Sequence, residues 1–204
     1  MAGFASLTLT PATALGLKNG DPEAQAEAYR LLAPRVLGMA QRILGDRGLA
    51  EEVVQDTFVT LIERGATLVD VDAAVGWIRQ TAINHCLMRL RSPWSQRRVA
   101  GLPVEAADAD ADGERTAALR DMEQALARLG PETRMVLWLH DVEGYTHQEI
   151  GELFGRTESF SKSQLARGYR KLLEQASGEE ATAAGDRHDD GYTRRTDLGP
   201  ACAS

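Results

Sequence analysis

Two clusters of basic side chains are the groups in this sequence best suited to bind a polyanion. Residues 79–98 carry five arginines and no acid, and residues 156–173 carry five basic residues against one glutamate. Such cations bind phosphates, while neighbouring amide and hydroxyl side chains can hydrogen bond to base edges. The pattern indicates nucleic acid as the partner, although charge alone also permits a merely solvated basic helix face.

The formal net charge of −7 over 204 residues hides these clusters, because the acids gather in other segments. Residues 103–114 contribute −5 and residues 174–204 contribute −4, so the rest of the chain carries +2. Two basic regions separated by an acidic spacer favour a nucleic-acid-binding protein over a generally acidic one.

Catalytic and metal chemistry find little support in the sequence. The two cysteines and four histidines lack the spacing of a disulfide framework or a metal site, and no phosphate-binding glycine loop or nucleophile elbow occurs. The cluster of His140, Asp141 and Glu143 precedes a Gly-Tyr turn and carries no signal of a pocket. We expect no catalytic residue, no metal and no cofactor.

No window reaches the roughly 18 to 20 uninterrupted apolar residues of a membrane span, and the N-terminus lacks the basic and apolar blocks of a secretory signal. We therefore expect a cytoplasmic protein without stable membrane insertion.

Helical periodicity dominates the chain and predicts an all-α fold of two small helical domains joined by an acidic flexible linker. Apolar residues recur at steps of three and four over 24–44, 50–62 and 75–90, which predicts a three-helix first domain with Asp72 as the N-cap of the third helix. Pro93 ends that helix. The sequence predicts an N-terminal segment (1–23), a first domain (24–94), a linker (95–114), a second domain (115–175) and a disordered acidic tail (176–204).

The second domain contains the signature of a helix-turn-helix. Thr146 and Glu149 form a capping box, Gly155 ends the short helix that follows, and a second helix runs to the Leu172-Leu173 pair. This second helix carries the second basic cluster on one side, as a recognition helix in a major groove requires. An ordinary helical hairpin with a solvated basic face is the alternative.

Three segments together resemble the extracytoplasmic-function (ECF) group of sigma-70 RNA polymerase sigma factors. Residues 129–155 are similar to the family's region four, residues 50–58 resemble its region two, and residues 77–84 resemble the helix that follows. The resemblance covers about 24–92 and 115–175. It implies a non-catalytic specificity subunit that binds core RNA polymerase at its clamp and flap regions and directs promoter recognition, strand opening and transcription initiation.

The resemblance also assigns roles to individual residues. The contact with the polymerase clamp would fall on Glu51, Glu52, Gln55 and Asp56, although periodicity alone favours a solvated face there. The melted minus-10 strand would contact Arg79, Asn84, Arg89 and Arg91, with the loop at 65–75 forming a pocket for a flipped base. The duplex minus-35 element would contact Arg156, Lys162, Ser163, Gln164, Arg167, Arg170 and Lys171. An anti-sigma factor is a further expected partner.

Three residues depart from the family pattern. Met88 stands where an aspartate is frequent, Ser161 replaces an apolar residue that would hold the two helices together, and Gln164 replaces a basic residue. The acidic tail is an addition that could be inert, bind a regulator or fold back on a basic surface.

Two other functions compete with a sigma factor. A sigma-like decoy that titrates an anti-sigma factor should lose its basic DNA-facing residues, and this chain keeps both clusters. A helix-turn-helix repressor would bind duplex DNA alone as a dimer, which the region-two motif and the two unlike basic surfaces disfavour.

Overall fold

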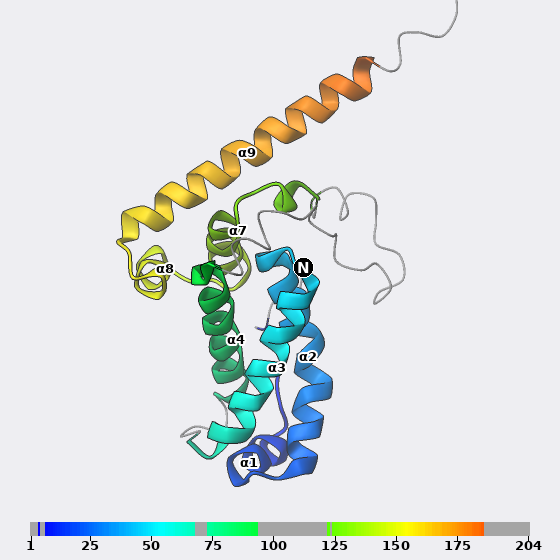
Figure 1. Cartoon of the computed structure of the whole chain (residues 1–204), viewed down its shortest axis with the longest axis vertical. Helices are drawn as coiled ribbons and strands as arrows, with labels where there is room; N and C mark the ends of the chain where they lie inside the picture. Colours follow the sequence, from blue (N-terminus) through cyan, green and yellow to red (C-terminus); the bar gives the residue numbers. More distant parts are fainter. Residues whose placement is uncertain (1–3, 5–6, 68–72, 94–121, 123, 186–204) are drawn as a thin grey trace, which may run out of the picture.

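The computed structural model describes residues 4, 7–67, 73–93, 122 and 124–185, with the backbone alone for 178–185. Every regular element in these ranges is helical, which confirms the all-α prediction for the described part of the chain. Figure 1 shows an upright group of helices, α1 to α4, with α7 and α8 at one end and the long α9 crossing above them. We call α1–α4 the first unit and α7–α9 the second unit.

Three amphipathic helices form the core of the first unit: α2 (Pro22–Leu44), α3 (Arg47–Arg64) and α4 (Ala74–Arg91). A tight turn joins α2 to α3. Gly45 adopts the left-handed conformation, with φ of 68°, and Asp46 caps α3 by accepting a hydrogen bond of 2.8 Å from the Leu49 amide. The apolar stripes predicted from the sequence meet in the centre, where Ile43, Leu49 and Ile78 are fully buried.

A helix that the sequence analysis did not predict lies in the N-terminal segment. Helix α1 (Pro11–Asn19) begins with Thr10 as N-cap and proline in its first turn, and Leu17 is buried against the three-helix core. The Thr13 hydroxyl donates to Glu27 Oε2 at 2.8 Å. Nine residues are too few for a stable isolated helix, so α1 depends on this packing.

The start of α4 also differs from expectation. The N-cap position is held by Ala73, which makes no side-chain cap hydrogen bond, so the prediction that Asp72 caps this helix is wrong. Asp72 and the rest of 68–72 lie outside the described residues, whereas the other parts of the expected 65–75 loop are the 3-10 turn η2 (Gly65–Thr67) and residues 73–75. The end is as predicted, because α4 stops at Arg91, two residues before Pro93.

The second unit contains the predicted helix-turn-helix. Helix α7 (Pro131–Leu137) continues into a π-helical turn, η4 (Trp138–Val142), and Gly144 with φ of 75° turns the chain into α8 (His147–Phe154). Both halves of the capping box at Thr146 and Glu149 are formed, which confirms that prediction. Gly155, with φ of 63°, ends α8 before α9 (Glu158–Gly185).

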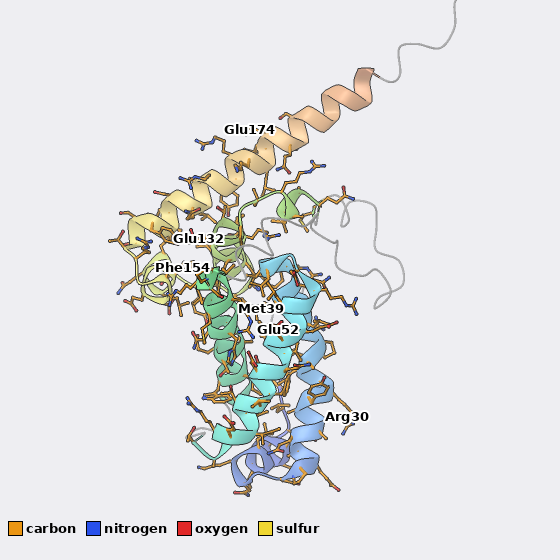
Figure 2. The ribbon with its side chains drawn as sticks, in the orientation of Figure 1. Arg30, Met39, Glu52, Glu132, Phe154 and Glu174 are labelled. Carbon is orange, nitrogen blue, oxygen red and sulfur yellow. The ribbon has the colours of Figure 1, made fainter. Side chains whose placement is uncertain are left out.

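Helix α9 is longer than the sequence analysis predicted. It runs to Gly185 instead of ending near Leu173, and its outer part projects beyond the other helices (Figure 2, where Glu174 is labelled). Residues 174–184 contain many good helix formers, and Gly178 costs only about 1 kcal/mol relative to alanine. The expected division at residue 175 therefore falls inside a helix. The linker at 95–114 and the tail beyond Gly185 lie outside the described residues.

The interior position of Cys86 predicts an unreactive thiol. The side chain is fully buried, and burial raises the pKa of Cys86 to about 12. In a Cys202→Ser variant, we expect the remaining thiol to resist a disulfide reagent at about pH 8 in the native protein and to react promptly once the protein is unfolded. A fast native reaction, followed by absorbance, would show that the α4 packing opens readily.

Candidate nucleic-acid and polymerase interfaces

The exposed face of α9 presents most of the residues expected to contact duplex DNA. Lys162, Ser163, Arg167, Arg170 and Lys171 are all exposed along it, and Arg156 is exposed in the turn before it. Two of these cations have neighbouring acids on the same helix: Lys162 Nζ lies 2.7 Å from Glu158 Oε1, and Arg170 Nε lies 4.0 Å from Glu174 Oε1. Surface pairs of this kind contribute little and can be exchanged for phosphate.

Gln164 is the exception. Its side chain is turned toward α7, where its Oε1 accepts a hydrogen bond of 2.7 Å from the Thr133 hydroxyl, and the residue is only 9% exposed. The prediction that Gln164 faces DNA is therefore wrong in this structure. An amide at this position satisfies a buried hydroxyl, which the basic residue it replaces could not do as an acceptor.

The other departure in α9 has a structural explanation as well. Ser161 is fully buried, and its hydroxyl lies 3.0 Å from Nδ1 of His147 at the start of α8. Beside it, the Phe154 and Phe160 rings pack with centroids 5.3 Å apart. A polar contact and an aromatic pair thus join the two helices where an apolar residue was expected.

Close packing also fixes α9 on α7. A Cβ atom on Gly168 would lie 2.7 Å from Leu137 Cδ1 and 3.1 Å from Thr133 Cγ2, so any larger residue at this crossing would force these side chains to shift. The side chains that hold α9 and those that it exposes therefore lie on different faces of one helix.

Helix α4 carries the residues expected to contact the melted strand, and each already has a protein partner. Asn84 is exposed, and its Oδ1 accepts a hydrogen bond of 3.3 Å from Gln80. Arg79 pairs with Glu143 of the second unit at 3.4 Å, and Arg91 donates to a backbone carbonyl of α8. Met88, one turn after Asn84, is 59% exposed on the same helix.

Arg89 is directed toward α3 rather than toward solvent. Its Nη2 lies 2.6 Å from Asp56 Oδ2 and its Nε lies 3.2 Å from Glu52 Oε2, with only 18% of the side chain exposed. The structure thus joins one expected DNA contact to two expected polymerase contacts. Glu51 and Gln55 remain exposed on α3, and Glu51 pairs with Arg47 at 2.9 Å.

His85 lies beneath this ion-pair cluster. Its Nε2 is 3.2 Å from the Thr60 hydroxyl and its Nδ1 is 4.0 Å from Asp56 Oδ2. Burial lowers the pKa of His85 below its ordinary value of 6.5, against the attraction of Asp56 and with a further lowering from Arg89.

Three residues that the sequence analysis did not assign to an interface connect the two units. Arg134 of α7 is 4% exposed, its Nη2 donates to the Leu44 carbonyl at the end of α2 at 3.2 Å, and burial lowers the pKa of Arg134 to about 10. Glu143 and Tyr145 contact α4. No sequence pattern could identify these three residues. Each lies on an amphipathic segment or in a turn, where a polar residue is expected to face solvent.

Among the described residues, no group of three His, Cys, Asp or Glu side chains is arranged to hold a metal ion. Every helix in those same ranges falls short of the length and apolarity that a bilayer crossing requires.

Comparison with known proteins matches this division into two units. The family described as Sigma-70 region 2 matches residues 28–96, and Sigma-70, region 4 matches residues 119–172. RNA polymerase sigma factor CarQ of Myxococcus xanthus is 30% identical over 162 residues, covering 77% of this chain and 91% of CarQ. The chain belongs to the ECF group of sigma-70 sigma factors.

Two further sigma factors are similar in sequence, and one solved structure is similar in fold. ECF RNA polymerase sigma factor SigE of Mycolicibacterium smegmatis is 28% identical over 168 residues, covering 78% of this chain and 65% of SigE. The chain spans 53% of SigI from Mycobacterium tuberculosis. Among solved structures, the co-crystal structure of the sigma factor RpoE with the anti-sigma factor NepR from Bartonella quintana matches with a TM-score of 0.54 and 20% identity, covering 74% of this chain and 96% of that one.

These findings make the protein an RNA polymerase sigma factor that acts in promoter recognition and transcription initiation. Sigma factors are non-catalytic subunits of the polymerase. The first unit corresponds to region 2 and the second unit to region 4.

The His85 environment predicts an acid-sensitive step in the stability of this sigma factor. Because the folded state disfavours protonated His85, the unfolded state binds more protons below the ordinary pKa of 6.5, and stability is lost as the pH falls through that value. We expect thermal melts to show a smaller loss for His85→Gln than for the unaltered protein between about pH 7.5 and about pH 5.5. Parallel curves for the two proteins would contradict this account.

Proposed function

We propose that this sigma factor directs core RNA polymerase to promoters by reading two elements with two separate helices. The observation that carries the proposal is the presence of two unlike polar surfaces on helices, one on α4 in region 2 and one on α9 in region 4. A dimeric repressor needs one recognition helix per protomer, whereas this chain presents two different ones.

For α9, we propose recognition of the duplex minus-35 element. The exposed side chains suit major-groove binding because lysine and arginine meet phosphates or guanine edges, and Ser163 can hydrogen bond to a base. The contacts of Gln164 and Ser161 with α7 and α8 support this role indirectly, since they fix the helix that presents the readers. Our proposed set is Arg156, Lys162, Ser163, Arg167, Arg170 and Lys171.

For α4, we propose contact with the melted minus-10 strand. Asn84 offers an amide to a base edge from an exposed position, and Arg79 and Arg91 offer guanidinium groups to the strand phosphates. Arg89 does not belong to this surface, but its ion pairs with α3 hold α4 in place.

For α3, we propose docking on the clamp of core polymerase, with region 4 contacting the flap. Glu51 and Gln55 are exposed, whereas Glu52 and Asp56 are fixed by Arg89, so that this face presents carboxylates in a defined arrangement. Ion pairs that restrict these side chains lower the conformational entropy that docking would otherwise cost.

The proposal has further parts, most of which follow from family membership. The protein itself has no catalytic activity, and it acts in the cytoplasm, where its polymerase works. An anti-sigma factor is a proposed partner, supported by the structural similarity to a sigma factor crystallised with NepR. The domain limits of 24–94 and 115–175 remain our proposal for the two functional units.

Run-off transcription with purified core polymerase tests the proposal. On a promoter selected by this factor, Arg167→Ala should weaken minus-35-dependent initiation by about 1 to 3 kcal/mol, because a cation that binds a base or phosphate is lost. Lys18→Ala, a cation of the first unit, is the matched control and should leave initiation unchanged.

Two results would contradict the proposal. Equal initiation by Arg167→Ala and Lys18→Ala would remove Arg167 from the binding surface. Binding of an anti-sigma factor without any transcription by the intact protein would favour the decoy function.

A further inference from the structure

The polar face of α4 is in contact with region 4. Arg79 Nη1 lies 3.4 Å from Glu143 Oε2, and the Arg79 guanidinium carbon lies 5.5 Å from the centre of the Tyr145 ring. The Tyr145 hydroxyl donates to Gln80 Oε1 at 2.7 Å, and the Gln80 amide in turn donates to Asn84 Oδ1. Region 4 thus contacts Arg79 of the proposed strand-binding residues directly and is linked to Asn84 only through Gln80.

The carboxylate of Glu143 binds Arg79 from a buried position. Its side chain is 1% exposed and accepts hydrogen bonds from Trp138 Nε1 at 3.2 Å and from Arg79. Guanidinium groups bind carboxylates and phosphates through the same charge-assisted hydrogen bonds. Glu143 therefore competes with a strand phosphate for Arg79.

A second contact closes the other end of the same helix. Arg91, the last residue of α4, donates from Nη2 to the Leu153 carbonyl of α8 at 2.9 Å. Contacts near the start and at the end of α4 therefore both involve arginines of the expected strand-binding surface.

We propose that Glu143, Tyr145 and the Leu153 carbonyl form a latch that occupies Arg79 and Arg91 of the strand-binding face of α4 in the free sigma factor. Binding of the promoter strand then requires the latch to open. This inference rests on the role proposed above for α4, and it makes region 4 a regulator of region 2 as well as a reader of duplex DNA.

The chemistry of the latch allows it to open reversibly. Its contacts with α4 are an ion pair, hydrogen bonds and a cation–π contact rather than a broad apolar surface, so the separated groups recover hydration in water. A closed state populated ten to one over the open state would lower the apparent affinity for the strand about tenfold.

Two nearly isosteric substitutions weaken the latch without cutting into the core. Glu143→Gln removes the charge that holds Arg79, and Tyr145→Phe removes the donor to Gln80 but keeps the ring. Glu152→Gln is the matched control, because it removes the same charge from an exposed position of α8 whose hydrogen bond stays within that helix.

Two measurements on the free protein test the latch. Spin labels on cysteines at exposed Leu31 and Ala176, in a Cys202→Ser background where Cys86 is buried, report the distance between the units. Fluorescence anisotropy with a labelled single-stranded oligonucleotide of random sequence reports strand affinity. For Glu143→Gln and Tyr145→Phe, we expect a longer or broader distance distribution and up to about tenfold tighter binding than for Glu152→Gln.

The outcomes separate the latch from the proposed function. Distances and affinities equal to those of the Glu152→Gln control would overturn the latch. Longer distances without tighter strand binding would also overturn it, because the contact would then be only structural. Failure of the unaltered protein to direct transcription would instead contradict the proposed function, while the distance measurement would still judge whether the contact opens.

Discussion

One buried guanidinium group joins the core of region 4 to the core of region 2. Arg134 of α7 inserts at the carboxyl end of α2, where the last carbonyl groups of a helix lack intrahelical partners and carry partial negative charge. Gly45 makes room for it, because a Cβ there would lie 2.6 Å from Arg134 Nη1, and the same glycine provides the left-handed turn that ends α2. Arg42 of α2 adds a second contact, with its guanidinium carbon 5.7 Å from the centre of the Trp138 ring.

This interface places the two proposed DNA-binding helices, α4 and α9, on a common support. The segment from α7 through η4 to α8 supplies Arg134 for α2 and Glu143 and Tyr145 for α4, while its opposite side supplies Thr133 and His147 for α9. A change in the position of region 4 on region 2 would therefore change which side chains α4 exposes. It would leave the packing of α9 against α7 and α8 unchanged. If both proposals hold, promoter recognition and its control involve the same short stretch of chain.

Local signals in the sequence predicted most of the helices and the helix-turn-helix, because amphipathic periodicity, the Thr146–Glu149 capping box and Gly155 act over a few residues. Such local signals do not indicate which side chains, distant in the sequence, will contact one another. From the sequence, Gln164 is a polar residue on a basic helix and is expected to face DNA, but in the fold α7 places Thr133 beside it. Arg89 is likewise expected to contact DNA, but in the fold α3 places two carboxylates within its reach. Helix α1 was missed because its short apolar pattern is stabilised only by tertiary packing.

Co-elution with core RNA polymerase on gel filtration is the most direct test of the central claim, that the chain is a sigma factor that docks through α3. The account predicts that the intact protein co-elutes stoichiometrically and that co-elution is lost in the variant Glu51→Ala/Glu52→Ala/Asp56→Ala. It is also lost in Glu51→Lys/Gln55→Lys, a variant that leaves the ion pairs of Arg89 intact. Co-elution is retained in the control variant, in which the exposed residues Glu23, Glu132 and Glu152 are changed to alanine. Failure of the intact protein to bind, or undiminished binding by both α3 variants, would contradict it.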